Sequence, residues 1–159
     1  MSERRKLGIG LISVGWMGKV HSRAYADLIA NYPQIPVQPR FVIAADPEPS
    51  RQEFAKQALG YEAATADYMD VLRNPNVDVV SICSPNFLHK EIALAAIAHG
   101  KHVWLEKPAG RGVEETREIA EAAAAAGVKT TIGFNYRHAP AIEYAKQLIS
   151  EGALGRITN

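Results

Sequence analysis

A glycine-containing turn near the amino terminus has the residues of a phosphate-binding site. It reads Ser13-Val14-Gly15-Trp16-Met17-Gly18 and follows an apolar run that begins at Leu7. In the pattern G-x-G-x-x-G, the second glycine lets the backbone approach a pyrophosphate, and the third lets the next helix pack closely on the strand. Gly15 and Gly18 fill these two positions, and Ser13 stands at the first. The turn predicts a dinucleotide site, although glycines also serve ordinary tight turns.

A carboxylate follows the next apolar run. Asp46 ends the stretch Val42-Ile43-Ala44-Ala45-Asp46. At the end of the second strand it would accept hydrogen bonds from the adenosine ribose and repel a 2′-phosphate, which favours NAD over NADP. Its separation from Gly18 exceeds the usual spacing of roughly 20 residues, and the proline-rich loop from Pro33 to Pro39 absorbs the difference. The alternative is that Asp46 only caps a helix that starts at Pro47.

Short apolar runs alternate with helical patterns throughout the chain, and this order positions the turn and the carboxylate. The predicted strands are 7–14, 41–45, 61–64, 77–83, 101–105 and 128–134, and the predicted helices are 17–31, 47–59, 67–73, 86–99, 113–126 and 140–150. Strands that are apolar on both faces indicate a parallel sheet covered on both sides. We therefore expect an α/β, doubly wound, mostly parallel sheet with strand order 3-2-1-4-5-6.

Composition narrows the classes of function. The 159 residues suffice for one domain, and a net charge of +1 gives no basic field for nucleic acid. No apolar run reaches the roughly 20 residues that a membrane helix needs. The basic residues Arg4-Arg5-Lys6 precede an apolar stretch as in a secretory signal, but the fold needs that stretch as its first strand.

The single cysteine and the histidines indicate neither a disulfide nor a metal. Cys83 lies in an apolar run, where we expect a buried, inert thiol, and one cysteine forms no internal disulfide, so a cytoplasmic location is expected. His99, His102 and His138 have no spacing typical of a metal site. His21, in the first helix, is expected to pack or cap that helix.

Three further segments give the chain a family resemblance. They are Ser84-Pro85-Asn86-Phe87-Leu88-His89, then Gly100-Lys101-His102-Val103-Trp104-Leu105-Glu106-Lys107-Pro108, and Gly133-Phe134-Asn135-Tyr136-Arg137-His138-Ala139-Pro140 with its continuation to Ile157. In order and spacing, together with the glycine turn, they resemble the Gfo/Idh/MocA oxidoreductases. The resemblance covers nearly the whole chain, and the Glu-Lys-Pro step is its most specific part.

The resemblance implies a reaction and a catalytic lysine. Family members pass a hydride between the nicotinamide of NAD(P) and a hydroxyl-bearing carbon of a sugar, polyol or related small molecule. Lys107 aligns with the lysine that lies beside the substrate hydroxyl and assists proton movement. An ammonium group near an oxidised nicotinamide is suited to hydrogen-bond a developing alkoxide. We also expect a cis peptide before Pro108.

The remaining cofactor contacts also follow from the resemblance. Glu106 aligns with a residue near the nicotinamide ribose, and Asn135 and Arg137 follow the sixth strand, where they would face the nicotinamide or the substrate. His89 opens a helix, so a purely backbone role remains an alternative. The expected cofactor-binding set comprises Ser13, Gly15, Trp16, Met17, Gly18, Asp46, Ser84, Pro85, Asn86, His89, Glu106, Asn135 and Arg137.

The resemblance also implies a second domain. We expect residues 1–150 to form the dinucleotide-binding domain and residues 151–159 to begin the connection to an α/β substrate domain that the sequence does not contain. That domain would complete the substrate pocket and, in a full-length parent, the interface of a homo-oligomer. The 159 residues are then expected to bind cofactor without turnover.

Two other functions remain open. Some relatives bind dinucleotide as sensors or co-regulators without catalysis, but such a protein would not need Lys107. A plain Rossmann domain for another nucleotide, such as S-adenosylmethionine, would also accommodate Asp46, but it would leave the Glu106-Lys107-Pro108 step without a role.

Overall fold

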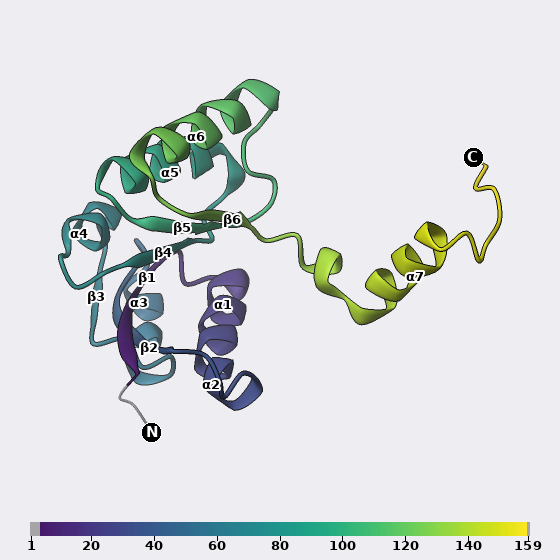
Figure 1. The fold of residues 1–159 in the computed structure, drawn as a ribbon. Helices are drawn as coiled ribbons and strands as arrows, with labels where there is room; N and C mark the ends of the chain where they lie inside the picture. Colours follow the sequence, from purple (N-terminus) through teal and green to yellow (C-terminus); the bar gives the residue numbers. More distant parts are fainter. Residues whose placement is uncertain (1–3, 159) are drawn as a thin grey trace.

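Six parallel strands form a single sheet in the order β3-β2-β1-β4-β5-β6 (Figure 1). The protein is seen here in a computed structural model that describes residues 4–158. The strands are β1 (Arg5–Ile12), β2 (Val37–Ala45), β3 (Ala63–Thr65), β4 (Val79–Ile82), β5 (His102–Leu105) and β6 (Thr130–Ile132). Strand order and direction confirm the predicted doubly wound α/β fold.

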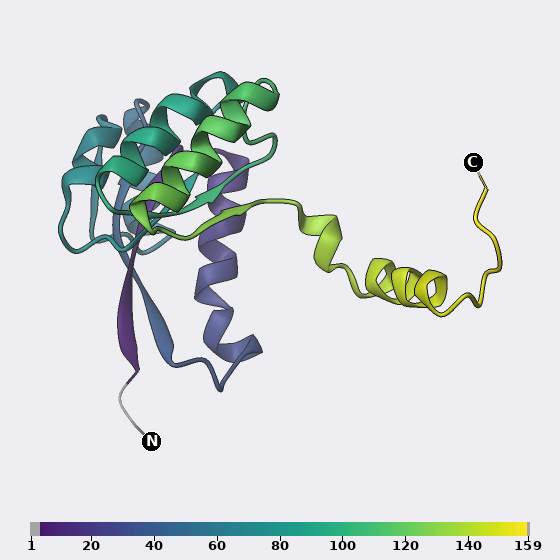
Figure 2. The same cartoon turned by 45° about the horizontal axis from the view of Figure 1, so that its top comes forward.

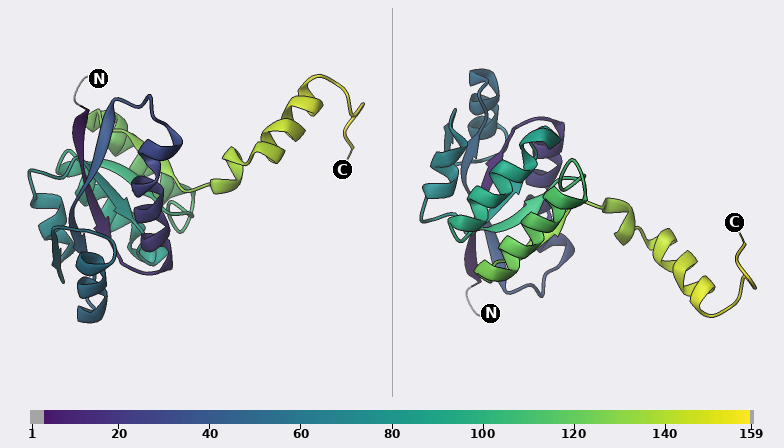
Figure 3. Two further views of the ribbon diagram at one scale, coloured as in Figure 1. Left: turned by 90° about the horizontal axis from the view of Figure 1, so that it is seen from below. Right: turned by 90° about the horizontal axis from the view of Figure 1, so that it is seen from above.

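Helices cover both faces of this sheet. They are α1 (Trp16–Ala26), α2 (Leu28–Asn31), α3 (Pro49–Gln57), α4 (Tyr68–Arg73), α5 (His89–Ala98), α6 (Val113–Ala126) and α7 (Pro140–Ser150), with 3₁₀ turns η1 (Asn86–Leu88) and η2 (Asn135–His138). Helices α1, α2 and α3 lie on one face and α4, α5 and α6 on the other (Figures 1 and 3). The strand segments that helices cover on both sides must therefore be apolar, as residues 42–45 of β2 are.

The covering helices create two hydrophobic clusters. The larger one joins α4, α5 and α6 to the sheet, and its centre includes Val71, Val80, Ile82, Ile92 and Leu105, each at most 2% exposed. The smaller one, beneath α3, consists of Leu11, Val14, Ala44, Ala55 and Tyr61. Leu11 and Ile12 of β1 thus enter different clusters, as do Ala44 and Ala45 of β2, which fixes the register of the strand ends that carry the site.

The last helix leaves the body of the fold. After β6 the chain passes through η2 into α7, which extends away from the sheet in each view (Figures 1, 2 and 3). Its Ile142, Tyr144 and Ile149 are exposed. None of the helices in residues 4–158 is both long and apolar enough to cross a membrane.

Most predicted boundaries differ from the observed ones by one to three residues, and two larger differences have a clear structural cause. The loop expected through Pro39 ends earlier, because β2 begins at Val37 and Pro39 pairs with Leu7 of β1. Since β3 pairs only with residues 43–45 of β2, the first half of β2 is an edge, where a proline without an N–H group is tolerated. The helix expected over 17–31 is interrupted at Asp27, between α1 and α2.

Candidate functional site

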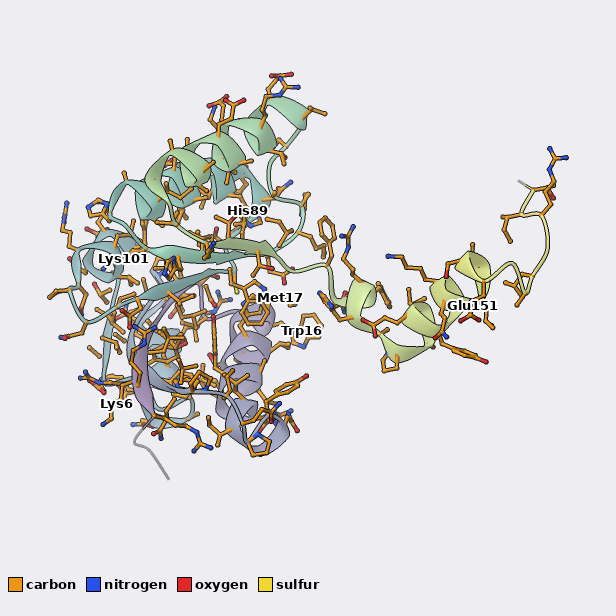
Figure 4. All side chains as sticks on the ribbon, in the orientation of Figure 1. Lys6, Trp16, Met17, His89, Lys101 and Glu151 are labelled. Atoms are coloured by element: carbon orange, nitrogen blue, oxygen red, sulfur yellow. The ribbon has the colours of Figure 1, made fainter. Side chains whose placement is uncertain are left out.

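The candidate site lies at the edge of the sheet where the parallel strands end. β1, β4 and β5 are neighbours, so the segments that follow them, residues 13–18, 83–86 and 106–108, leave the sheet side by side. The strand order reverses between β1 and β4, and ligands bind at such switch points in doubly wound sheets. Figure 4 shows Trp16, Met17 and His89 toward this edge and Lys101 toward the opposite one.

Ser13 makes the turn that ends β1. Its φ is +73°, a left-handed conformation that side chains rarely adopt and that costs roughly 1–2 kcal/mol outside glycine. Its amide donates to the carbonyl oxygen of Ala45 at 2.8 Å, which ties the turn to the end of β2. The first glycine position of the motif therefore keeps the glycine conformation although a serine occupies it.

Gly15 forms the open part of the turn. It is the N-cap of α1, and no side chain caps the first amides of this helix. A Cβ added at Gly15 would meet only the Ser13 hydroxyl oxygen, at 3.8 Å. The backbone here is therefore accessible to a ligand, and the free amides at a helix start suit an anion. A pyrophosphate fits this position. Next to it, Trp16 is 77% exposed and Met17 is half-buried.

Gly18 has a different role. A Cβ on this residue would collide with the carbonyl oxygen of Ser13 and would lie 3.3 Å from Leu11 Cδ2. Only glycine lets α1 approach the end of β1 this closely. The structure thus supplies the close helix-to-strand packing that the sequence pattern predicts for the third glycine position.

Asp46 lies beside the turn, but its carboxylate is already engaged. The residue is 2% exposed. Oδ2 accepts a hydrogen bond from the Val14 amide at 2.8 Å, and Oδ1 accepts one from the Glu48 amide at 3.0 Å. The Arg51 guanidinium lies 3.6 Å from Oδ2. Because α3 begins at Pro49, Asp46 closes a turn two residues before the N-cap, and it also supports the phosphate turn.

The loop after β4 carries a buried hydroxyl group without a partner. Ser84 Oγ is buried and has no hydrogen-bond partner among the described residues. Pro85 and Asn86 follow it and are exposed, at the start of η1. Buried hydroxyl groups nearly always have a partner. The unpaired hydroxyl group at this edge is therefore consistent with a ligand that supplies one.

Glu106 is a buried carboxylate at the end of β5. It is 6% exposed, and its Oε1 accepts a hydrogen bond from His21 Nε2 at 3.1 Å. Its Oε2 faces the Lys107 amide at 3.2 Å. A Cβ on Gly133, after β6, would collide with Oε1. Three separate segments therefore hold one carboxylate, which the pattern of the sequence alone does not indicate.

His21 supports Glu106 from α1. Its ring is 1% exposed and stacks on Trp104 with centroids 3.7 Å apart. Burial lowers the pKa of His21 below its usual value, although the neighbouring Glu106 carboxylate acts in the opposite direction. Burial, together with the negative charge of Glu106, raises the pKa of the Cys83 thiol, which is half-buried where the sequence predicted a buried one.

Lys107 and the residues after β6 point into more open surroundings. Lys107 is exposed, and the peptide bond between Lys107 and Pro108 is cis, which confirms that expectation. Asn135 and Arg137 are exposed on η2, between the sheet and α7. The structure thus brings the residues after β1, β4 and β5 together, whereas Asn135 and Arg137 lie on the segment that leaves the fold.

Lys101, in the motif of residues 100–108, has a structural role. Lys101 is 8% exposed, and its Nζ donates to the carbonyl oxygens of Asn74 and Val77, both at 2.8 Å. Burial lowers the pKa of this ammonium group. It lies before β5, at the opposite edge from Lys107. Within residues 4–158, no cluster of His, Cys, Asp or Glu side chains has the geometry of a metal site.

The chain is similar in sequence to known proteins. Residues 7–134 match the family described as "Oxidoreductase family, NAD-binding Rossmann fold", Gfo/Idh/MocA. Levoglucosan dehydrogenase from Pseudarthrobacter phenanthrenivorans is 39% identical over 153 residues, and scyllo-inositol 2-dehydrogenase (NAD(+)) from Bacillus subtilis is 30% identical over 146 residues. The matches cover 96% and 92% of this chain, but only 39% and 41% of the two relatives.

Solved structures give the same result. A levoglucosan dehydrogenase in complex with NADH and levoglucosan superposes with a TM-score of 0.89 at 39% identity, over 96% of this chain and 41% of that one. A scyllo-inositol dehydrogenase from Lactobacillus casei with NAD(H) and scyllo-inositol superposes with a TM-score of 0.83 at 30% identity, over 97% and 44%. The chain thus spans less than half the length of these relatives.

Proposed function

Because the chain belongs to the Gfo/Idh/MocA family of NAD-binding oxidoreductases, we propose that it is the nucleotide-binding part of a dehydrogenase for sugars or polyols. In this proposal the 159 residues bind NAD(H). Transfer of hydride between the nicotinamide and a hydroxyl-bearing carbon belongs to a longer polypeptide, such as the relatives. Residues 1–150 form the cofactor-binding domain, and residues 151–159 begin the connection to a substrate domain.

The observation that carries this proposal is the combination of an open glycine turn and an unpaired hydroxyl group on neighbouring strands. Gly15 leaves the uncapped start of α1 accessible at the end of β1. Ser84 offers a buried hydroxyl group without a partner at the end of β4. A dinucleotide that crosses the sheet edge at the switch point would contact both.

Each group at this edge has a distinct task in the proposal. The amides after Gly15 bind the pyrophosphate. Asp46 accepts from the adenosine ribose in place of the exposed Arg51 side chain, which lies 3.6 Å from its Oδ2. Because Asp46 would face a 2′-phosphate, NAD(H) is preferred over NADP(H). Glu106 borders the ribose of the nicotinamide half. When bound, the cofactor supplies the hydride acceptor or donor.

Lys107 is the proposed catalytic residue. Its exposed ammonium group would hydrogen-bond the oxygen of the substrate hydroxyl and stabilise the negative charge that develops there. A sensor without turnover would need the cofactor groove but not this lysine. Asn135 and Arg137, which are exposed on η2, would face the nicotinamide or the substrate. A homo-oligomer of the longer protein is part of the same proposal.

Calorimetric titration tests the binding part of this proposal. The chain should bind NADH at one site and bind NADPH more weakly. With levoglucosan or scyllo-inositol and NAD⁺, it should form no NADH, because positioning of the alcohol against the nicotinamide, worth about 7–11 kcal/mol, needs a complete pocket. If the chain binds neither cofactor, the proposed function is refuted. Rapid turnover by the 159 residues would refute the proposal that hydride transfer needs a longer polypeptide.

A further inference from the structure

We propose that His89 is a positioning residue that joins the loop after β4 to the Lys107–Pro108 step after β5. The inference rests on the proposed function, because these two segments are the candidate cofactor loop and the candidate catalytic step. His89 does not have to touch the cofactor in this role. It fixes where Ser84 and Lys107 lie relative to each other.

The geometry of the ring supports this role. His89 Nδ1 lies 2.7 Å from the carbonyl oxygen of Pro108, and Nε2 lies 2.8 Å from the carbonyl oxygen of Ser84. The residue is 1% exposed, so water does not substitute for either partner. A carbonyl oxygen only accepts hydrogen bonds, and a neutral imidazole carries a single N–H group. Both contacts are hydrogen bonds only when the ring carries a hydrogen on each nitrogen.

The charged side chains near His89 pair with other residues, so the two carbonyl oxygens are the partners of its ring. Its neighbours on α5 are engaged elsewhere: Lys90 pairs with Glu118 of α6, and Glu91 accepts from the Tyr68 hydroxyl at 2.7 Å. Among the described residues, no carboxylate is within hydrogen-bond distance of His89. Hydrogen bonds from a charged donor are stronger than those between neutral groups, so this ring is well suited to hold two backbone segments.

The two segments have few other connections. The Glu106 amide donates to the Ile82 carbonyl oxygen at 3.0 Å. Beyond that point, no backbone hydrogen bond joins residues 83–86 to residues 107–109 in the part of the chain that the structure describes. His89 therefore supplies a side-chain connection at the point where the regular pairing of β4 and β5 ends. Ser84, whose hydroxyl group is unpaired, and Pro108, which follows Lys107, are its two partners.

Two variants and one control test the inference on the 159-residue chain. His89→Leu removes both donors, and His89→Gln keeps an amide that reaches one of the two oxygens. His99→Gln is the matched control, because exposed His99 bonds only a carbonyl of its own helix, Ala95, at 2.8 Å. We expect the dissociation constant for NADH to rise about tenfold or more in His89→Leu, the effect of one lost charged hydrogen bond, less in His89→Gln and not in His99→Gln.

Nitrogen-15 NMR of the ring separates this inference from the proposed function. In the folded chain His89 should show two slowly exchanging ring N–H groups, one for each carbonyl contact, and His21, whose pKa is lowered by burial, should show only one. A single ring N–H group on His89, or unchanged NADH affinity in a folded His89→Leu variant, would overturn the inference. If the wild-type chain binds no NADH, the proposed function fails, but the ring spectrum still shows whether His89 donates from both ring nitrogens. If His89→Leu does not fold, the NADH affinity of His89→Gln and the ring spectrum of the wild-type chain test the inference instead.

Discussion

The imidazole of His21 donates to the carboxylate of Glu106 across 85 positions of sequence, at 3.1 Å. The pair joins α1, which follows the glycine turn, to the segment after β5 that carries Lys107. Since both side chains are buried, each depends on the other for a hydrogen-bond partner. The contact connects the phosphate end of the candidate site with its catalytic end.

This contact predicts a pH dependence of stability. Burial lowers the pKa of His21 in the folded chain, so the unfolded chain binds a proton more readily. The free energy of unfolding should therefore be highest above the unfolded pKa of about 6.5 and should decrease as the pH falls below it. His21→Gln, which keeps a donor for Glu106 but does not titrate, should lose this part of the dependence. Urea unfolding between pH 5 and 8 measures both chains, and identical pH profiles would argue against the assignment.

Ser13→Gly should stabilise the chain. Ser13 holds a left-handed φ of +73°, which glycine adopts without strain. The relief of about 1–2 kcal/mol is partly offset by the greater freedom of glycine in the unfolded chain, so a gain of up to about 1 kcal/mol is expected. Ser13→Ala, which keeps the strain, is the control. Equal stability of the glycine and alanine variants, measured by urea unfolding, would show that strain at position 13 is negligible.

Substitutions of the two glycines in this turn should have different effects, one on cofactor binding and one on stability. Gly15→Val should fold, because its Cβ enters open space, but it should not bind NADH, because the side chain occupies the position of the pyrophosphate. Gly18→Val should lose roughly 3 kcal/mol of stability or fail to fold, because its Cβ collides with the backbone of Ser13. Thermal melting and NADH titration separate the two effects. Normal NADH affinity in Gly15→Val would place the phosphates elsewhere.

Asp46→Asn should change both stability and cofactor choice. The amide nitrogen of asparagine accepts no hydrogen bond, so the Val14 or the Glu48 amide loses its partner, at a cost of about 1–3 kcal/mol. The preference for NADH over NADPH should narrow because the repelling charge is gone. Glu48→Gln, which removes an exposed charge nearby, is the control. An unaltered ratio of the two affinities would remove Asp46 from the selection of NAD.

The strand order could be predicted because it follows from local patterns. Apolar runs such as 77–83 and 101–105 alternate with helical periods, and only a few topologies satisfy that alternation. Their ends are less accurate: the run 7–14 predicted a strand to Val14, whereas β1 ends at Ile12, because Ser13 turns the chain. A hydrophobic pattern records burial, and Val14 is buried although it is not in a strand.

The contacts of the site could be predicted only in part. The glycine turn and the Glu-Lys-Pro step form local motifs, so the sequence identifies them directly. His21 was expected only to pack or cap its helix, because its partner Glu106 is distant in sequence and a lone histidine carries no pattern. Lys101 shows the reverse, since it belongs to a conspicuous motif but donates to two carbonyl oxygens at the opposite edge.

The central claim is that a dinucleotide binds across the ends of β1 and β4, and an amide NMR titration of the chain with NADH tests it most directly. We predict saturable shifts that are largest at the amides of Gly15, Met17, Gly18 and Ser84, with the Lys101 amide unaffected. Titration with NADPH should give smaller shifts at equal concentration. No saturable change, or changes centred near Lys101 at the opposite edge of the sheet, would contradict the account.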